Sequence, residues 1–400
     1  MKKNLALLLC FFFSHAVFHF LAQSFAVLLP SIQQTFGVTP VQIGALITVR
    51  EIAIGLISLP GGILSDYFAR HRAHLLSGCL LLYGIAWLLI GWAHYYYVLF
   101  GGMVLIAAAS AVWHLPSLVE LGARFPDKRG TVFAIHGAGG SSGDIVGPMA
   151  TGLLLAYFSW REILTIYTTL PLVIAVWTFL LISRLSRQEP TWADKKTPTP
   201  RTDPKVNLGL CWDILKSTDI WLVNVVAGLR SMCFSVLITF LPIYMHDSGF
   251  SAASIGFHFG LLWAIGLLAS PVMGFFSDRW GRKIVLVPAL LYSSLMVAIL
   301  AFYGTGSLFT LLIILLGFSI RSDYSLINAT IIDIVKGRAE STMLGILSFS
   351  RALMGAVAPL FAGFLYQQSG MKAALLFVST LFLLASILFS SARLNRAHTL

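Results

Sequence analysis

Long apolar stretches alternate with short polar connections along the whole sequence. Each stretch reaches or approaches the roughly 20 residues that a helix needs to cross the hydrocarbon core of a bilayer. The pattern predicts an all-α membrane protein. Its twelve expected membrane-spanning helices lie at residues 5–30, 41–64, 73–93, 95–121, 130–158, 162–183, 219–245, 252–276, 284–303, 306–332, 341–367 and 371–392.

The composition excludes an ordinary soluble protein. Hydrophobic residues make up 58% of the chain and charged residues 11%, whereas about a quarter of the residues of soluble proteins are charged. With the N-terminus inside, only Arg161 and Lys372 of the basic residues outside the spans fall on the outer side. Because Lys and Arg concentrate in cytoplasmic connections, we expect a multi-pass inner-membrane protein with both termini cytoplasmic. The net charge of +11 then reflects topology and indicates no nucleic-acid partner.

One long polar segment, rich in proline and charge, divides the predicted spans into six and six. Such a composition is typical of a linker between compact regions. We therefore predict an N-terminal six-helix bundle at 1–183, a cytoplasmic linker at 184–218 and a C-terminal six-helix bundle at 219–400.

The two halves contain an internal repeat. The segment GGILSDYFARHR at 61–72 matches MGFFSDRWGRK at 273–283, and a glycine upstream and a Pro-x-x-x-Gly downstream recur at nearly the same offset. Two related six-helix units are typical of transporters built from parallel repeats, whose binding sites lie near the middle of the membrane. The matched pairs are Gly62 and Gly274, Asp66 and Asp278, Arg70 and Arg282, Gly44 and Gly256, Pro148 and Pro359, and Gly152 and Gly363.

The doubled Gly-x-x-x-Asp-x-x-x-Arg pattern resembles the signature of the major facilitator superfamily, and the resemblance covers essentially the whole chain. It implies a cytoplasmic gate in which the glycines permit close helix approach and the aspartates pair with arginines or cap a helix end. The alternative is that these are ordinary turn and topology residues. Ala69 stands where the family pattern has glycine. The expected gate residues are Gly62, Asp66, Arg70, Gly274, Asp278 and Arg282.

Three further stretches resemble the fosmidomycin-resistance-type exporters of that superfamily. They are SH at 14–15, AVWHLPS at 111–117 and GAGGSSGDIVGP at 137–148. The sequence departs from that pattern at His19, where an acidic residue is expected, and at Leu115, which separates an expected His-Pro pair. These departures concern the residues that would meet the substrate.

A glycine stripe runs along the fifth predicted span. Gly139, Gly143 and Gly147 are four residues apart and Pro148 follows, so they form a flat strip on which a neighbouring backbone can pack closely. The stripe resembles the antiporter motif of exporters, which implies a hinge formed by these four residues. Plain helix packing is the alternative, and the two are physically compatible. The arginine that drug and proton antiporters usually carry in the fourth span is missing.

Polar side chains interrupt the first span at His15, His19 and Gln23, which share one helix face because they are spaced four apart. The family resemblance implies that the first, fourth, seventh and tenth spans line a central cavity. Ionisable residues inside a membrane indicate function by default. The expected substrate-binding residues are His15, His19, Gln23, Arg50, His114, Arg230, Arg321 and Arg351, with Glu51, Asp144 and Asp323 as possible counter-charges.

These residues predict a secondary active transporter that moves a small anionic or polar organic compound by alternating access, as a monomer and by proton-coupled export. Guanidinium groups bind carboxylates and phosphonates with two hydrogen bonds, and histidine titrates near physiological pH. His19 and Asp144 are the candidates for proton coupling. We expect no catalytic residue, cofactor or resident metal ion.

Two other functions compete with this one. In the first, the same cavity exports or takes up an anionic metal chelate such as a siderophore, or a transition metal ion, because imidazoles suit such metals. His15, His19, His114 and His136 would then bind the metal. In the second, the chain is an intramembrane enzyme or sensor, but the sequence holds no HExxH or P-loop motif.

Overall fold

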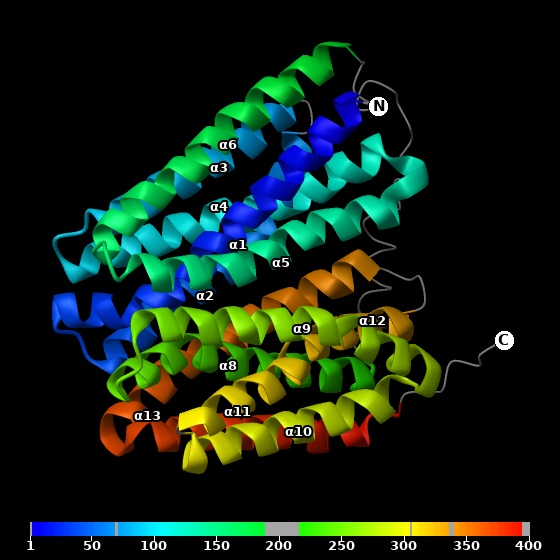
Figure 1. Cartoon of the computed structure of the whole chain (residues 1–400). Coiled ribbons are helices and arrows are strands. Elements are labelled where there is room, and N and C mark those ends of the chain that lie inside the picture. Colours follow the sequence, from blue (N-terminus) through cyan, green and yellow to red (C-terminus); the bar gives the residue numbers. More distant parts are fainter. Residues whose placement is uncertain (1, 69–70, 189–215, 305, 336–339, 394–400) are drawn as a thin grey trace. The chain divides into compact units, whose positions relative to one another are not determined.

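The computed structural model describes residues 2–68, 71–188, 216–304, 306–335 and 340–393. Within these ranges the chain forms a succession of long helices joined by short turns (Figure 1). The elements are α1 Lys2–Phe36, α2 Pro40–Tyr67, α3 Arg72–Gly91, α4 Tyr96–Arg124, the 3₁₀ turn η2 Pro126–Lys128, α5 Arg129–Leu154, α6 Trp160–Gln188, α8 Thr218–Asp247, α9 Ala252–Trp280, α10 Arg282–Tyr303, α11 Gly306–Ile320, α12 Ser322–Val335 and α13 Glu340–Ser391.

The helices agree with the twelve predicted spans. In the described part of the chain, 10 helical segments are long and apolar enough to cross a membrane, and one of them combines α11 and α12 as Gly306–Val335. The long α13 contains two helices, divided where Gly370 leaves the helical conformation with a φ of 76°. The glycines and serines of α5 lower its hydropathy, and this helix is the remaining span. The predicted all-α membrane fold is confirmed.

Residue contacts divide the chain into two compact units. The first consists of Met1–Gly37, Ile52–Thr199 and Ser248–Gly260, and the second of Val38–Glu51, Pro200–Asp247 and Leu261–Leu400. The start of α2 therefore belongs to the second unit and the start of α9 to the first. α6 continues to Gln188, five residues into the predicted linker, and residues 189–215 lie outside the described part.

The repeated glycines occupy equivalent places in the two units. A Cβ atom on Gly44 would lie 2.3 Å from the carbonyl oxygen of Pro359, and a Cβ on its repeat partner Gly256 would lie 2.3 Å from that of Pro148. Glycine is required at both positions because a neighbouring backbone occupies the space of a side chain. The sequence repeat therefore corresponds to a repeated helix contact.

In the first unit α1 packs along α5, and α3 packs between α4 and α6. Large aromatic side chains fill the space between these helices, including Tyr83, Trp87 and Trp113, all of which are fully buried. The Tyr83 hydroxyl donates a hydrogen bond of 2.7 Å to the carbonyl oxygen of Phe18. This packing and the hydrogen bond fix the position of α1 along its axis relative to α3.

In the second unit α8 and α10 pack against α13. Serine pairs link the helices there, with Oγ to Oγ distances of 2.7 Å for Ser293 and Ser319 and 3.0 Å for Ser294 and Ser379. The span predicted at 306–332 is interrupted at Arg321, which separates α11 from α12. The resulting turn lies next to Arg230 and Asp323.

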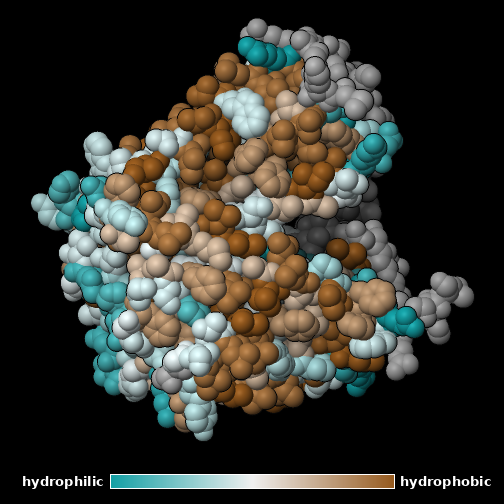
Figure 2. Space-filling model, viewed as in Figure 1, coloured by the Kyte–Doolittle hydropathy of each residue, from teal (hydrophilic) through white to brown (hydrophobic). Residues whose placement is uncertain are grey.

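Apolar side chains cover much of the outer surface. In Figure 2 brown, hydrophobic residues extend across the helices on the visible face. Leu56, Val173 and Leu268 are among the large apolar side chains that are more than half exposed. Patches of this extent would be unfavourable in water, and they suit helices whose outer faces contact lipid.

Candidate functional site

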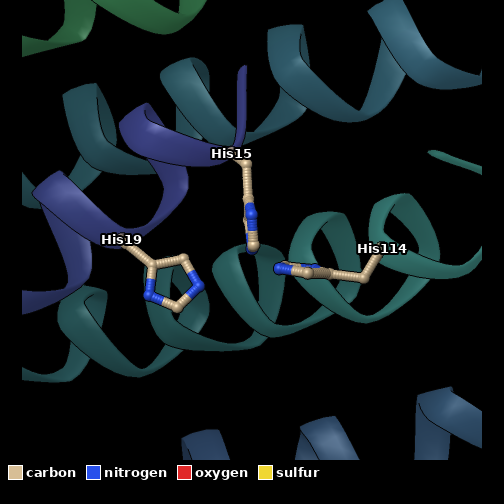
Figure 3. Close-up of side chains that lie close together, drawn as sticks. All are labelled: His15, His19 and His114. Atoms are coloured by element: carbon tan, nitrogen blue, oxygen red, sulfur yellow. The ribbon is translucent and has the colours of Figure 1, made fainter. Parts of the chain in front are cut away.

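Three imidazole rings meet inside the first unit, and we call His15, His19 and His114 the histidine cluster. One ring nitrogen of each lies within 4.8 Å of a ring nitrogen of the other two. His15 and His19 come from α1 and His114 from α4, and their rings converge (Figure 3). The ring centroids are 4.6 Å apart for His15 and His19 and 5.2 Å apart for His15 and His114.

Each ring of the cluster uses its Nδ1 atom to bond an oxygen. His15 Nδ1 lies 2.8 Å from the carbonyl oxygen of His136, and His114 Nδ1 lies 2.7 Å from that of Ser110. His19 Nδ1 lies 2.8 Å from Oδ1 of Asp144. A carbonyl oxygen can only accept, so Nδ1 of His15 and of His114 carries the proton. The hydrogen bond at Nδ1 thus sets the tautomer and leaves Nε2 with its lone pair.

The glycine stripe of α5 holds α1 close enough for these bonds to form. Cβ atoms on Gly139, Gly143 and Gly147 would lie 2.3, 2.2 and 2.5 Å from carbonyl oxygens of α1, those of Phe12, Ala16 and Phe20. The stripe therefore places two helix backbones in direct contact, as its spacing predicts. One consequence is that Asp144, beside Gly143, reaches His19.

A fourth histidine adjoins the cluster. The His136 ring stacks on that of His15 with centroids 4.2 Å apart and an angle of 10° between the planes. His136 is only 3% exposed, and its Nδ1 atom has no hydrogen-bond partner among the described residues. The four histidines of the alternative metal hypothesis therefore do lie together. Gln23, farther along α1, keeps a buried Oε1 atom without such a partner.

In the second unit Arg230 spans the interruption between α11 and α12. Its Nε atom donates to Oδ1 of Asp323 at 2.8 Å, and its Nη2 atom donates to the carbonyl oxygen of Ile320. The guanidinium group thus satisfies both a buried carboxylate and a carbonyl at the end of a helix. Arg230 and Asp323 are both buried, so this pair has a clear structural role.

Arg351, on α13, has a different environment. It is 8% exposed, and its Nη1 and Nη2 atoms donate to Asn328 Oδ1 at 3.1 Å and to Ser348 Oγ at 3.2 Å. Its Cζ atom lies 4.4 Å from the centroid of the Tyr324 ring. In the part of the chain that the structure describes, these partners are all neutral. We call Arg351, Tyr324, Asn328 and Ser348 the Arg351 site.

The two other predicted arginines lie elsewhere in the second unit. Arg321 occupies the turn between α11 and α12, with its Cζ atom 5.4 Å from the centroid of the Trp263 ring. Arg50 Nη2 donates to Oε1 of the adjacent Glu51 at 2.6 Å. Each of the three expected counter-charges bonds a basic side chain: Glu51 bonds Arg50, Asp323 bonds Arg230, and Asp144 bonds His19.

The second copy of the predicted gate motif forms an ion-pair network. Arg282 Nη1 donates to Asp278 Oδ1 at 2.5 Å and its Nε atom donates to Asp333 Oδ2 at 2.7 Å. Asp333, which lies far from this motif in the sequence, was not among the predicted gate residues. A Cβ atom on Gly274 would have no described neighbour within 4 Å, so the close helix approach expected there is not found. Arg70 lies outside the described residues, as do the side chain of Asp66 and the surroundings of Gly62.

A buried acid in α4, outside the predicted site residues, forms a second ion-pair network. Glu120 is 5% exposed and accepts hydrogen bonds from Arg72 at 3.2 Å and from Arg124 at 2.5 Å.

A pocket of about 490 Å³ lies near the ends of α3 and α6, lined by Gly91, Trp92, His94, Phe158, Arg161, Glu162, Thr165 and Ile166. None of the predicted site residues lines it, so the side-chain chemistry of the clusters is the stronger guide to function.

Comparison with known proteins identifies the family. The family model described as "Major Facilitator Superfamily" matches residues 11–268 and 220–399, which together cover nearly the whole chain. The chain belongs to the major facilitator superfamily. Like its relatives, it is a transporter for small molecules and not an enzyme.

Several relatives support the family at the level of sequence. The hexuronate transporter of Bacillus subtilis (strain 168) is 21% identical over 92% of this chain and 89% of its own length. The 2-nitroimidazole transporter of Escherichia coli (strain K12) is 26% identical over 59% of this chain and 56% of its own length. The multidrug resistance protein MdtG of Klebsiella pneumoniae (strain 342) is 30% identical over 39% of this chain and 40% of its own length.

Solved structures show the same fold. The nucleoside transporter NupG superposes with a TM-score of 0.79 at 16% identity, covering 98% of this chain and 99% of that one. An inward-facing, unoccupied bacterial homologue of the human lysosomal transporter Spinster superposes with a TM-score of 0.77 at 15% identity, covering 99% and 98%. At such low identity the likeness concerns the fold alone.

Proposed function

We propose that this superfamily member is a proton-coupled exporter of a small anionic organic compound, similar to the fosmidomycin-resistance-type exporters. It acts as a monomer by alternating access, in the inner membrane, with both termini in the cytoplasm. Relatives named for multidrug resistance support export. One relative, which matches over most of both chains, is named for hexuronates, which are carboxylated sugars and therefore anions.

The observation that carries the proposal is the Arg351 site. A guanidinium group remains charged in proteins, and a buried charge without an opposite partner is strongly unfavourable. Arg351 is buried among neutral described partners. A carboxylate or phosphonate of the transported compound would supply the missing negative charge and would suit the planar donor group of arginine. The half-exposed Tyr324 offers a ring face beside it.

Proton coupling is assigned to His19 and Asp144. The His19 side chain is 34% exposed and that of Asp144 is 2% exposed, so the pair joins an accessible imidazole to a buried carboxylate. Together the two groups can take up or release a proton while remaining hydrogen-bonded. We place the hinge of the transport cycle at Gly139, Gly143, Gly147 and Pro148, and the cytoplasmic gate at Arg282 with its aspartates.

The test is a binding screen followed by transport. Purified full-length protein is heated with and without organic carboxylates and phosphonates, and a compound that stabilises the protein is confirmed by calorimetry. Arg351→Gln is expected to lower its affinity about 10-fold or more, which corresponds to the loss of at least ~1.4 kcal/mol. Arg161→Gln is the control, because that guanidinium contacts the Ala93 carbonyl and the Trp160 ring. Arg230 is unsuitable because its removal would leave Asp323 buried and unpaired.

The same compound is then tested in sealed vesicles that contain a pH-sensitive dye. Its movement through the wild-type protein is expected to be accompanied by proton movement in the opposite direction. Asp144→Asn is expected to keep binding but lose the proton flux. Equal binding by the wild type and Arg351→Gln would exclude the anion site, and an unchanged proton flux in Asp144→Asn would exclude this route for the proton.

A further inference from the structure

We infer that the histidine cluster is a binding site for one divalent transition-metal ion of the kind that imidazoles prefer, with Zn²⁺ as the reference ion. The inference shares His19 and Asp144 with the proposed proton route, but it does not depend on the anionic cargo or on the Arg351 site, which lies in the other unit. The site consists of His15, His19 and His114 as ligands. Asp144 and the carbonyl groups of His136 and Ser110 hold the ligands in place.

The spacing of the rings is close to that of a metal site. Zn²⁺ binds imidazole nitrogens at about 2.0 to 2.1 Å in tetrahedral geometry, which places two such nitrogens roughly 3.3 Å apart. The ring nitrogens of the cluster lie within 4.8 Å of one another. Each ring nitrogen therefore has to move by about 1 Å or less to reach a shared ion.

The hydrogen bonds at Nδ1 point more specifically to a metal. A histidine that binds a metal through one nitrogen almost always donates the other N–H to a carboxylate, a carbonyl oxygen or water. All three members of the cluster do so, His19 to Asp144 and His15 and His114 to carbonyl oxygens.

The charges in the cluster also favour a cation. With Nδ1 protonated in His15 and His114, the Nε2 atom of each presents a lone pair that can bind a cation. The Asp144 carboxylate, which contacts His19, adds a negative charge at the edge of the site. Imidazoles suit Zn, Cu, Fe and Ni among biological metals, whereas Mg²⁺ and Ca²⁺ prefer oxygen ligands.

Three protein ligands leave one position of a tetrahedral ion open. Structural zinc sites are closed by four protein ligands, whereas sites that exchange a ligand keep one position for water or another molecule. His136 stacks on His15 and supports the ring without joining the group of three. The arrangement therefore fits an ion that binds reversibly.

The experiment uses purified full-length protein that has been treated with a chelator and then titrated with Zn²⁺ by calorimetry. We expect one Zn²⁺ per chain. His15→Gln and His114→Gln are each expected to weaken binding at least 10-fold, and Asp144→Asn to weaken it by about 10- to 100-fold. His258→Gln is the matched control, because His258 is a buried histidine of a membrane helix whose Nδ1 bonds the Ser254 carbonyl, as His114 bonds that of Ser110. Its affinity should equal that of the wild type.

X-ray absorption at the zinc edge tests the same site without any substitution. The wild-type complex is expected to show imidazole nitrogens at about 2.0 to 2.1 Å. Absence of Zn²⁺ binding, an ion surrounded by oxygen or sulfur alone, or binding that survives both histidine substitutions would overturn the inference. Because the cargo screen is made without metal, failure of either proposal leaves the other open to its own test.

Discussion

A single methyl group at Gly143 should separate α1 from α5. The Cβ atom of an alanine there would lie 2.2 Å from the Ala16 carbonyl oxygen and 2.7 Å from the Phe20 amide nitrogen. Both neighbours are backbone atoms, so no side chain can rotate away. Ordinary contacts of a Cβ atom begin near 3.4 Å, and the two helices must therefore move apart by about 1 Å at this point.

The expected cost follows from two opposing effects. Overfilling a packed interior costs about 1 to 3 kcal/mol, while replacing glycine by alanine inside a helix returns up to about 1 kcal/mol. A net destabilisation of up to roughly 2 kcal/mol remains once the full gain in helix propensity is subtracted. In addition, the separation lengthens the 2.8 Å bond between His19 and Asp144, so the damage reaches the histidine cluster.

Gly137 provides a control on the same helix, since a Cβ atom there would have no neighbour within 4 Å. Gly137→Ala should leave stability unchanged or raise it slightly, because only the gain in helix propensity applies. The assay is thermal unfolding of both purified variants in the same detergent, where 1 kcal/mol corresponds to about 2 to 4 °C for a domain of this size. Equal melting temperatures for the two variants would refute the argument from backbone contact.

Two buried ion pairs give further predictions. Asp323→Asn should destabilise the protein by about 3 to 5 kcal/mol, because Arg230 stays buried without its carboxylate; adding Arg230→Gln should recover part of the loss in thermal unfolding, and strictly additive effects would contradict this. Glu120→Gln should cost about 1.5 to 3 kcal/mol because the guanidinium groups of Arg72 and Arg124 lose a charged acceptor. High salt should not reproduce that second effect, since burial shields the pair from ions, and a salt-dependent difference in melting temperature would count against it.

The fold was largely predictable because its main determinants are local. Hydropathy locates the spans, and the repeat relates the two halves without any knowledge of contacts. Two features escaped this reasoning. The break at Arg321 depends on Arg230 from another helix, which binds the Ile320 carbonyl, and α1 continues through Pro30 to Phe36 because neighbours and side chains compensate for a missing N–H in membrane helices.

The candidate site was predicted as a set of residues but not as a geometry. Spacing alone places His15 and His19 on one face, whereas their meeting with His114 depends on how α4 packs against α1. The different roles of Arg230 and Arg351 could not be predicted either, because the sequence does not show which arginine forms the ion pair with Asp323. Asp333 was missed for the same reason, since its partner Arg282 lies on another helix.

The composition of α5 has a consequence for how this helix is retained in the bilayer. Its glycines and serines give it little affinity for lipid, and it is absent from the described segments that are apolar enough to span a membrane. Its attachment must come mainly from the backbone contact with α1. An enlargement on the surface of α1 that faces α5 would therefore weaken the anchorage of α5, whose contacting glycines lie more than a hundred positions away along the chain.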